Sequence, residues 1–323
     1  MINQNAITKI QGINFREFLL KYGLYIGFVI IFVVLSILSP SFLTIGNIIN
    51  VIDQFAYYII GAIGMLFVVI TGGVDLSNSG MIALAGVLGA TVMVNTKNVI
   101  LGCIVVIGIS SLGGLINGLS IARVGMPAFV ATLAFQNINR GTAFTLTSGR
   151  TIAGLPESIT SFNFKRIFGI RSSIFILIVV FFIAYYLLNH TKFGKMLYAV
   201  GDNSKASRVM GINVKRVKIF AYTICGICTG IATIILVSYM GSARAAVAEN
   251  LHLECIAAVM IGGASATGGE GKITGTLLGA MLFAMLKNGL NLLGFSYYYQ
   301  LIASGIIIYI AATIDRMRVR AGY

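Results

Sequence analysis

The chain has 323 residues, of which 58% are hydrophobic and 10% are charged, and its mean hydropathy is +0.94. This composition leaves no room for a water-soluble catalytic domain. The formal net charge of +14 does not indicate nucleic-acid binding, because the basic residues lie in short segments beside apolar runs, as membrane topology predicts. The four cysteines also lie in apolar stretches, which argues against disulfide bonds.

Long uncharged runs divide the chain between Lys21 and Asp315. A helix needs about 20 apolar residues to cross a hydrocarbon core of about 30 Å, and it satisfies its backbone hydrogen bonds within one segment. We therefore predict an all-α, polytopic transmembrane helical bundle over residues 22–315. Its ten predicted spans lie at about 22–39, 53–71, 79–95, 99–121, 128–147, 172–189, 217–239, 253–265, 273–293 and 298–314.

The ends of the chain and its longest loop carry most of the positive charge. Residues 1–21 have apolar residues at helical spacing beside basic ones, which predicts a cytosolic interfacial segment, and residues 316–323 form a basic tail. With both ends in the cytosol, fifteen basic residues face inward and six face outward, and this bias favours that orientation. The inner set is Lys9, Arg16, Lys21, Arg123, Lys192, Lys195, Lys205, Arg208, Lys215, Arg216, Lys218, Lys272, Arg316, Arg318 and Arg320, and the outer set is Lys97, Arg150, Lys165, Arg166, Arg171 and Arg244.

Glycine pairs end one predicted span, interrupt another and recur at close spacing in others. Gly72 and Gly73 follow the second span, and Gly262 and Gly263 break the eighth, which is too short to cross alone. Such glycine-broken half-helices usually line an enclosed path, where irregular backbone is tolerated. Pairs of glycines four residues apart, which allow helices to approach closely, are Gly114 with Gly118, Gly226 with Gly230 and Gly275 with Gly279.

Several polar residues fall inside or between the spans, where they are costly and mark either a transport path or a structural contact. Asp75 stands just before a predicted helix and so either caps its N–H groups or contacts a solute. Arg140 either pairs internally or binds a polar solute. The asparagines suit a path for a hydroxyl-rich, uncharged solute, and interhelical hydrogen bonds explain them equally well. The candidate path residues are Asp75, Ser77, Asn137, Asn139, Arg140, Asn288 and Asn291.

The longest predicted cytosolic loop spans residues 190–216. Asp202 or Asn203 can cap a short helix there, and Gly211 can end it. A helix of about eight residues is not stable alone, so it needs a docking partner, which makes this loop the candidate contact with a cytosolic protein. The alternative is a solvated basic connector.

Four ordered segments resemble the permease subunits of ribose-type ABC sugar importers. They are Gly-Gly-Val-Asp-Leu-Ser (72–77), Gly-Asp-Asn-Ser-Lys-Ala-Ser-Arg-Val-Met-Gly-Ile-Asn-Val (201–214), Ile-Ala-Ala-Val-Met-Ile-Gly-Gly-Ala-Ser-Ala-Thr-Gly-Gly-Glu-Gly (256–271) and Asn-Gly-Leu-Asn-Leu-Leu-Gly (288–294). The resemblance covers nearly the whole chain, including Ser39-Pro40-Ser41-Phe42 and Asn47.

The resemblance implies a permease for a monosaccharide, a ribose-like pentose or a hexose, in the bacterial inner membrane. It implies a homodimer of ten-span subunits, a cytosolic ATP-binding subunit and a periplasmic or lipid-tethered sugar-binding protein, with no cofactor and no catalytic residue in this chain. It also implies that residues 201–213 couple the permease to the ATPase. The coupling candidates are Gly201, Asp202, Asn203, Ala206, Ser207, Arg208, Gly211, Ile212 and Asn213.

The chain departs from the family pattern in two places. Family members usually have Val-Gly-Ser after the Asp-Leu-Ser motif, where this chain has Asn78-Ser79-Gly80. They also tend to carry Tyr-Glu-Leu-Asp before Ile-Ala-Ala, where this chain has Leu251-His252-Leu253-Glu254-Cys255. Both departures fall near the predicted path or its outer mouth, and they bear on which sugar is carried.

Two other classes of function fit the sequence less well. An ion-driven carrier would place acidic residues or histidines inside spans as relays, and only Asp75 and Glu254 are candidates. A membrane enzyme would need a nucleophile beside a base, and no such pair is recognisable. Gly271-Lys272 imitates part of a P-loop, but Ala266 and Ile273 replace its first glycine and its Ser/Thr. ATP hydrolysis is therefore expected in a separate subunit.

The predicted orientation can be tested by cysteine-accessibility labelling. Cysteines introduced near residues 205 and 320 should react with a membrane-impermeant reagent only from the cytosolic side, because the charge bias places both regions inside. Labelling of either position in intact cells would reverse the orientation.

Overall fold

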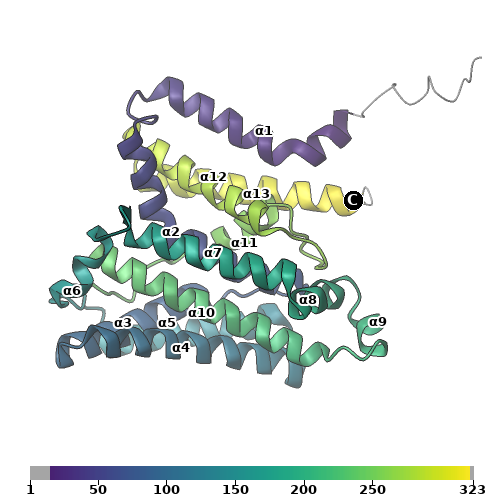
Figure 1. The fold of residues 1–323 in the computed structure, drawn as a ribbon, viewed down its shortest axis with the longest axis horizontal. Helices are drawn as coiled ribbons and strands as arrows, with labels where there is room; N and C mark the ends of the chain where they lie inside the picture. The colour runs from purple at the N-terminus through teal and green to yellow at the C-terminus, as the bar shows by residue number, and fades with distance from the viewer. Residues whose placement is uncertain (1–14, 321–323) are drawn as a thin grey trace, which may run out of the picture.

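The structure, a computed structural model, describes residues 15–320, which form a bundle of long helices (Figure 1). Ten of its helices overlap the ten segments predicted as spans, although α11 ends four residues before the predicted end of the eighth. The elements in chain order are α1 (Phe15–Leu38), α2 (Ile45–Ile70), α3 (Asn78–Thr96), α4 (Val99–Leu119) with a π-helical extension (Ser120–Val124), α5 (Ala128–Thr147), α6 (Glu157–Thr160), a 3₁₀ turn (Phe162–Phe164), β1 (Arg166–Ile167), β2 (Ile170–Arg171), α7 (Ser172–His190), α8 (Lys192–Asp202), α9 (Ser204–Val209), α10 (Val214–Met240), α11 (Leu251–Ile261), α12 (Ile273–Leu292) and α13 (Tyr297–Arg320).

The all-α, polytopic fold predicted from the sequence is confirmed. Within the described residues, six helices are long and apolar enough to cross a membrane: α2, α3, α4 with its extension, α7, α10 and α12. The predicted half-length segment is α11, which has 11 residues and has Gly262 as its C-cap residue. Most of the predicted interfacial segment at residues 1–21 lies outside the described residues, since α1 begins at Phe15.

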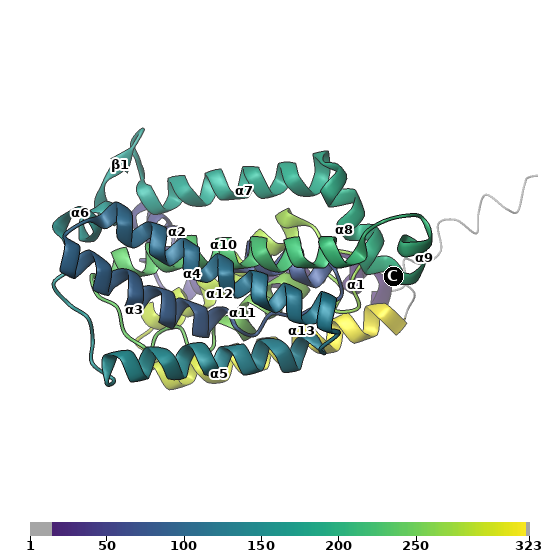
Figure 2. The ribbon, with the colours of Figure 1, turned by 90° about the horizontal axis from the view of Figure 1, so that it is seen from below.

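The ends of the long helices gather at two opposite ends of the bundle (Figures 1 and 2). One end, called here the α9 end, holds α8 and α9 together with the start of α1 and the end of α13. The other, called the hairpin end, holds α6 and the antiparallel pair of β1 and β2. The first and last described helices therefore begin and end on the same side of the molecule.

The second helix is the centre of the bundle. Every residue of α2 from Tyr58 to Ile70 is buried, and α2 packs against α7, α10, α11 and α12. A helix that is apolar all round is stable only when other helices cover it. Thus α2 acts as the axis around which both halves of the chain pack.

Close backbone contacts join the helices where the glycine pairs occur. A Cβ added at Gly114 would lie 2.3 Å from the carbonyl oxygen of Tyr222, and one at Gly226 would lie 2.3 Å from that of Ser110. Cβ atoms at Gly275 and Gly279 would lie 1.9 and 2.1 Å from carbonyl oxygens, and those at Gly118 and Gly230 would lie 2.9 and 3.0 Å from Cα atoms of the facing helix. The predicted role of these glycines in helix packing is confirmed, because any side chain would force α4 and α10, or α11 and α12, apart.

Substituting Gly226 with alanine should destabilise the bundle, because the new methyl group would overlap the backbone of α4. Overpacking of this kind costs about 1–3 kcal/mol. Thermal unfolding in detergent, followed by size-exclusion chromatography, measures the effect.

Gly108→Ala, in helix α4 of the same pair but outside the close contact, is the matched control. Within the described part of the chain, no atom lies within 4 Å of a Cβ added there, so this helix-interior change should stabilise the protein by roughly 0.5–1 kcal/mol. Equal melting temperatures for both variants would contradict the packing argument.

Candidate functional site

The loop predicted at 190–216 contains two helices. Thr191 caps α8, and Asn203 caps α9 by accepting hydrogen bonds from the N–H groups of Lys205 (3.1 Å) and Ala206 (3.0 Å). Gly211 follows α9 with a left-handed φ of +82°. The predicted short helix is confirmed with Asn203 as its cap, whereas Asp202 is the last residue of α8. Helix α8 itself was not predicted.

The surface of α9 is divided between an inner and an outer face. Ser207 is buried and donates a hydrogen bond to the carbonyl of Ala199 (2.7 Å), which holds α9 against α8. The apolar residues Val209 and Met210 are 89% and 71% exposed at the tip, and sequence reasoning did not select them. The other predicted coupling residues are exposed (Asp202, Asn203, Ala206, Arg208, Gly211, Asn213) or half-buried (Gly201, Ile212).

Helix α8 is joined closely to both glycine-broken regions. A Cβ at Gly201 would lie 1.8 Å from the carbonyl oxygen of Ile70, and the N–H of Gly269 donates to that same oxygen at 2.9 Å. The Tyr198 hydroxyl donates to the carbonyl of Gly271 (2.7 Å), and burial raises the pKa of Tyr198, which keeps this donor protonated. We call this contact of α8, the end of α2 and residues 267–271 the joint.

The joint packs the backbone of α8 directly against the end of α2 and the loop between α11 and α12. Backbone contacts without intervening side chains leave little room for one element to slide independently.

A second buried cluster surrounds the break after α2. One carboxylate oxygen of Asp75 accepts hydrogen bonds from the N–H (2.9 Å) and hydroxyl (2.6 Å) of Ser77 and from the amide of Asn117 (3.5 Å). Asp75 and Ser77 are fully buried. Ser77 is the N-cap residue of α3, so Asp75 acts two positions earlier, in an Asx-type turn that shapes the start of the helix.

Arg140 connects three segments through backbone carbonyls. Its guanidinium donates to the carbonyls of Ser79 (3.1 Å), Ala245 (3.0 Å) and Val247 (3.1 Å). It therefore ties α5 to the start of α3 and to the 241–250 segment. Asn139 is buried beside it, whereas Asn137 is exposed on the single chain.

The two asparagines of α12 also differ in exposure. Asn288 is buried and exchanges two hydrogen bonds with Asn47 of α2 (3.0 and 3.1 Å). Asn291 is exposed near the end of α12. The structure thus accounts for Asn288 as an interhelical contact.

The two departures from the family pattern meet in space. The hydroxyl of Ser79 lies 2.9 Å from Nδ1 of His252, and Gln136 of α5 bonds both the Ser79 hydroxyl and the N–H of Gly80. A Cβ at Gly80 would lie 2.4 Å from the carbonyl oxygen of Gln136. The two departing segments are far apart in the sequence, but they meet at one contact between α3, α5 and α11.

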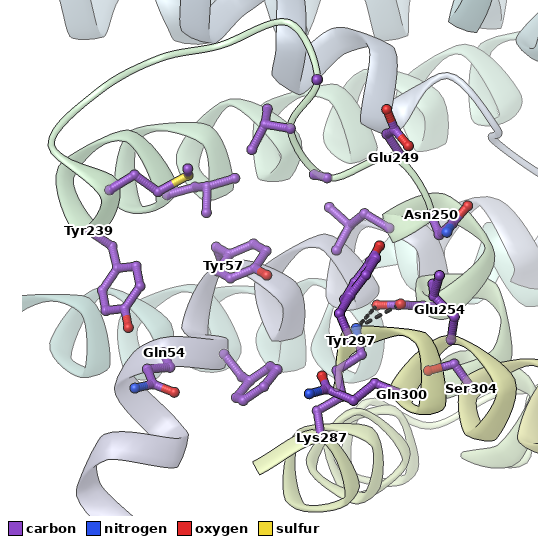
Figure 3. A pocket seen from close by; sticks show the side chains of 18 of the residues that line it. Gln54, Tyr57, Tyr239, Glu249, Asn250, Glu254, Lys287, Tyr297, Gln300 and Ser304 are labelled. Carbon is purple, nitrogen blue, oxygen red and sulfur yellow. Dashed lines mark hydrogen bonds and ion pairs between the residues drawn. The ribbon is translucent and has the colours of Figure 1, made fainter. Parts of the chain in front are cut away.

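A cavity of about 700 Å³ lies among α2, α10, α11, α12, α13 and the 241–250 segment (Figure 3). Glu254 and Lys287 form an ion pair on its wall, with Nζ 2.6 and 2.7 Å from the two carboxylate oxygens. None of the seven candidate path residues lines it. The polar lining residues are Gln54, Tyr57, Tyr239, Arg244, Glu249, Asn250, Glu254, Lys287, Tyr297, Gln300 and Ser304.

The sequence contained one signal for this cavity. Lys287 lies within a predicted span and Glu254 near the end of another, and charges in such places usually have a partner. Their pairing depends on how α11 packs against α12, which spacing along the chain does not reveal.

Comparisons with known proteins agree with this architecture. Residues 47–312 match the family described as branched-chain amino acid transport system / permease component. The chain is 40% identical over 320 residues to the ribose import permease protein RbsC of Bacillus subtilis (strain 168), covering 98% of this chain and 99% of that protein. It is 35% identical over 307 residues to RbsC of Escherichia coli (strain K12), with 94% and 96% covered.

A further relative is the L-arabinose transport system permease protein AraH of Escherichia coli (strain K12), which is 33% identical over 301 residues, with 93% and 92% covered. No solved structure matches the chain significantly. The helical bundle and the full-length matches together define a multi-pass membrane permease. The chain belongs to the branched-chain amino acid transport system / permease component family.

Removing the Arg140 contacts should loosen the wall of the cavity. Arg140→Leu leaves the carbonyls of Ser79, Ala245 and Val247 without this donor, and hydrogen bonds to a charged group contribute about 1.5–3 kcal/mol each. We expect lower thermal stability and faster thiol labelling of a cysteine placed at Ala246. Arg150→Leu, which removes the same charge from an exposed position, should leave both unchanged; equal labelling rates in the two variants would contradict this role.

Proposed function

We propose that the chain is the transmembrane permease subunit of an ATP-driven ABC importer for a monosaccharide, a ribose-like pentose or a hexose. The observation that carries this proposal is the similarity to ribose and L-arabinose permeases over more than 90% of both chains. In the proposal a binding protein, periplasmic or lipid-tethered, delivers the sugar, and a separate cytosolic subunit hydrolyses ATP. The permease acts as a homodimer in the bacterial inner membrane.

The proposed topology has ten spans with both ends in the cytosol. Residues 1–21 form the interfacial segment, 22–315 the transmembrane domain and 316–323 the basic tail. The common position of the start of α1, the end of α13 and the α8–α9 pair supports this arrangement (Figure 1). The α9 end is then cytosolic, and the hairpin end faces the binding protein.

In this proposal α9 is the surface that contacts the ATPase. Ala206, Arg208, Val209 and Met210 are exposed there, so the helix presents a small apolar tip beside a cation. The joint supports the proposal because it links α8 directly to the end of α2 and to the loop between α11 and α12. ATP-driven movement would then pass from α9 through Gly201 to the backbone of Ile70.

The candidate path residues fall into an exposed group and a buried or hydrogen-bonded group. Asn137 and Asn291 are exposed on the single chain and so are available to a solute or to a second copy. Asp75, Ser77, Asn139, Arg140 and Asn288 are hydrogen-bonded or buried, and in the proposal they hold together the helices that form the walls of the path.

Uptake into membrane vesicles tests the proposal. Vesicles that contain the permease, its ATPase and its binding protein should accumulate labelled ribose when ATP is supplied on the ATPase side, and ionophores should not prevent it. Uptake that needs an ion gradient and no ATP would instead support the ion-driven carrier, for which Asp75 and Glu254 were the candidate relays.

The coupling surface can be tested in the same assay. Ala206→Glu places a bulky charge on the docking face, and Gly211→Val forces a β-branched residue into a left-handed conformation that costs about 1–2 kcal/mol. Both changes should abolish uptake and weaken association with the ATPase, while the bundle stays folded.

Lys195→Glu is the matched control, since Lys195 is exposed on α8 outside the proposed contact. Normal uptake and normal ATPase association in the Ala206 and Gly211 variants would show that α9 is not the coupling element.

A further inference from the structure

The cavity lies in the half of the bundle that is nearer the hairpin end. Its walls include Tyr239 and Met240 at the end of α10 and Tyr297 at the start of α13. Under the topology proposed above, this half faces the side from which a solute arrives. At about 700 Å³ the cavity falls within the range of roughly 300–1,000 Å³ typical of small-molecule sites.

The charges that line the cavity balance one another. Arg244 and Lys287 contribute two positive charges, and Glu249 and Glu254 contribute two negative ones. The remaining polar groups are tyrosine and serine hydroxyls and side-chain amides, which both donate and accept hydrogen bonds. A cavity with this lining suits a neutral, hydroxyl-rich solute better than an ion.

The ion pair has hydrogen-bonding capacity to spare. Lys287 Nζ carries three N–H groups and uses two on the carboxylate of Glu254, and each carboxylate oxygen keeps a further lone pair. One hydroxyl of a solute can therefore accept from Lys287 while its neighbour donates to Glu254. Figure 3 shows the pair beside Tyr297, Gln300 and Ser304, with Gln54, Tyr57 and Tyr239 across the cavity.

We propose that this cavity is a receiving site for a neutral, polyhydroxylated solute, in which the Glu254–Lys287 pair binds two adjacent hydroxyl groups. The inference rests on the proposed sugar-permease function and adds a binding site within the single chain. Binding at such a site must be weak, because a solute that is to be transported has to leave again.

The Glu254–Lys287 pair can be replaced by apolar residues without leaving a buried charge. The Glu254 and Lys287 side chains are only 9% and 22% exposed, and an apolar pair of similar volume is often as stable as a buried ion pair. The variant Glu254→Leu with Lys287→Met therefore removes the hydroxyl-binding groups without leaving an unpaired charge. This variant separates ligand binding from folding.

Protection from thiol labelling provides a direct test that does not depend on transport. Ala246 is exposed and lines the cavity, so Ala246→Cys in a Cys103→Ser background places a reporter there. In the purified permease in lipid nanodiscs, D-ribose at about ten times its Kd should slow labelling of Cys at this position about tenfold, since the bound fraction is shielded. The Glu254→Leu with Lys287→Met variant should lose this protection.

The control removes the other ion pair found among the described residues. Asp53→Asn with Arg171→Met deletes one charge of each sign near the hairpin end, outside the cavity, and keeps an amide for Asn163 and Ser173. This variant should keep full protection by ribose. Loss of protection in both variants to the same degree would show a general effect of charge removal and would overturn the proposal.

The choice of probe separates this inference from the proposed function. Protection by leucine, equal to or stronger than that by ribose, would show that the ion pair binds an amino-acid zwitterion and would overturn the proposal. No protection by ribose, in a permease that supports ATP-driven ribose uptake, would overturn the receiving site alone. No protection together with no sugar uptake would overturn both.

Discussion

The structure depends on the contact between the backbone of α8 and the end of α2. At Gly201 no side chain separates the two elements, and the carbonyl oxygen of Ile70 already accepts a hydrogen bond from Gly269. Three segments that are far apart in the chain therefore share one point. Because α2 is buried along its inner half and packs against α7, α10, α11 and α12, this contact is continuous with both halves of the bundle.

Charged groups inside the bundle serve two different purposes. Asp75 and Arg140 direct their hydrogen bonds mainly to neighbouring backbone and short polar side chains, so they shape the helix starts and hold the 241–250 segment. Glu254 and Lys287 satisfy one another and still face a cavity. Burial of a charge is costly in either case, and of these two arrangements the ion pair is the one that lines the cavity.

Local signals predicted the helices and the cap of the coupling segment well. Each of the ten segments predicted as spans overlaps a helix, and six of these helices are long and apolar enough to cross a membrane, since length and hydropathy are properties of each segment by itself. Asn203 and Gly211 marked the two ends of α9 for the same reason, because capping involves residues only a few positions apart. Helix α8 was missed although Phe193, Met196, Leu197 and Val200 have the spacing of one helix face, because a short segment with two glycines and two lysines also fits a solvated connector.

The sequence by itself determined the class of fold, the glycine-broken segments and the family resemblance, because each depends on residues that are near neighbours or on motifs in a set order. Only the tertiary structure decided which polar groups meet. Ser79 reaches His252, Asn47 reaches Asn288 and Glu254 reaches Lys287 across gaps in the chain that no periodicity specifies. Those pairings follow from how α11 and α12 pack against α2 and α3, and packing of whole helices is a property of the bundle rather than of any one segment.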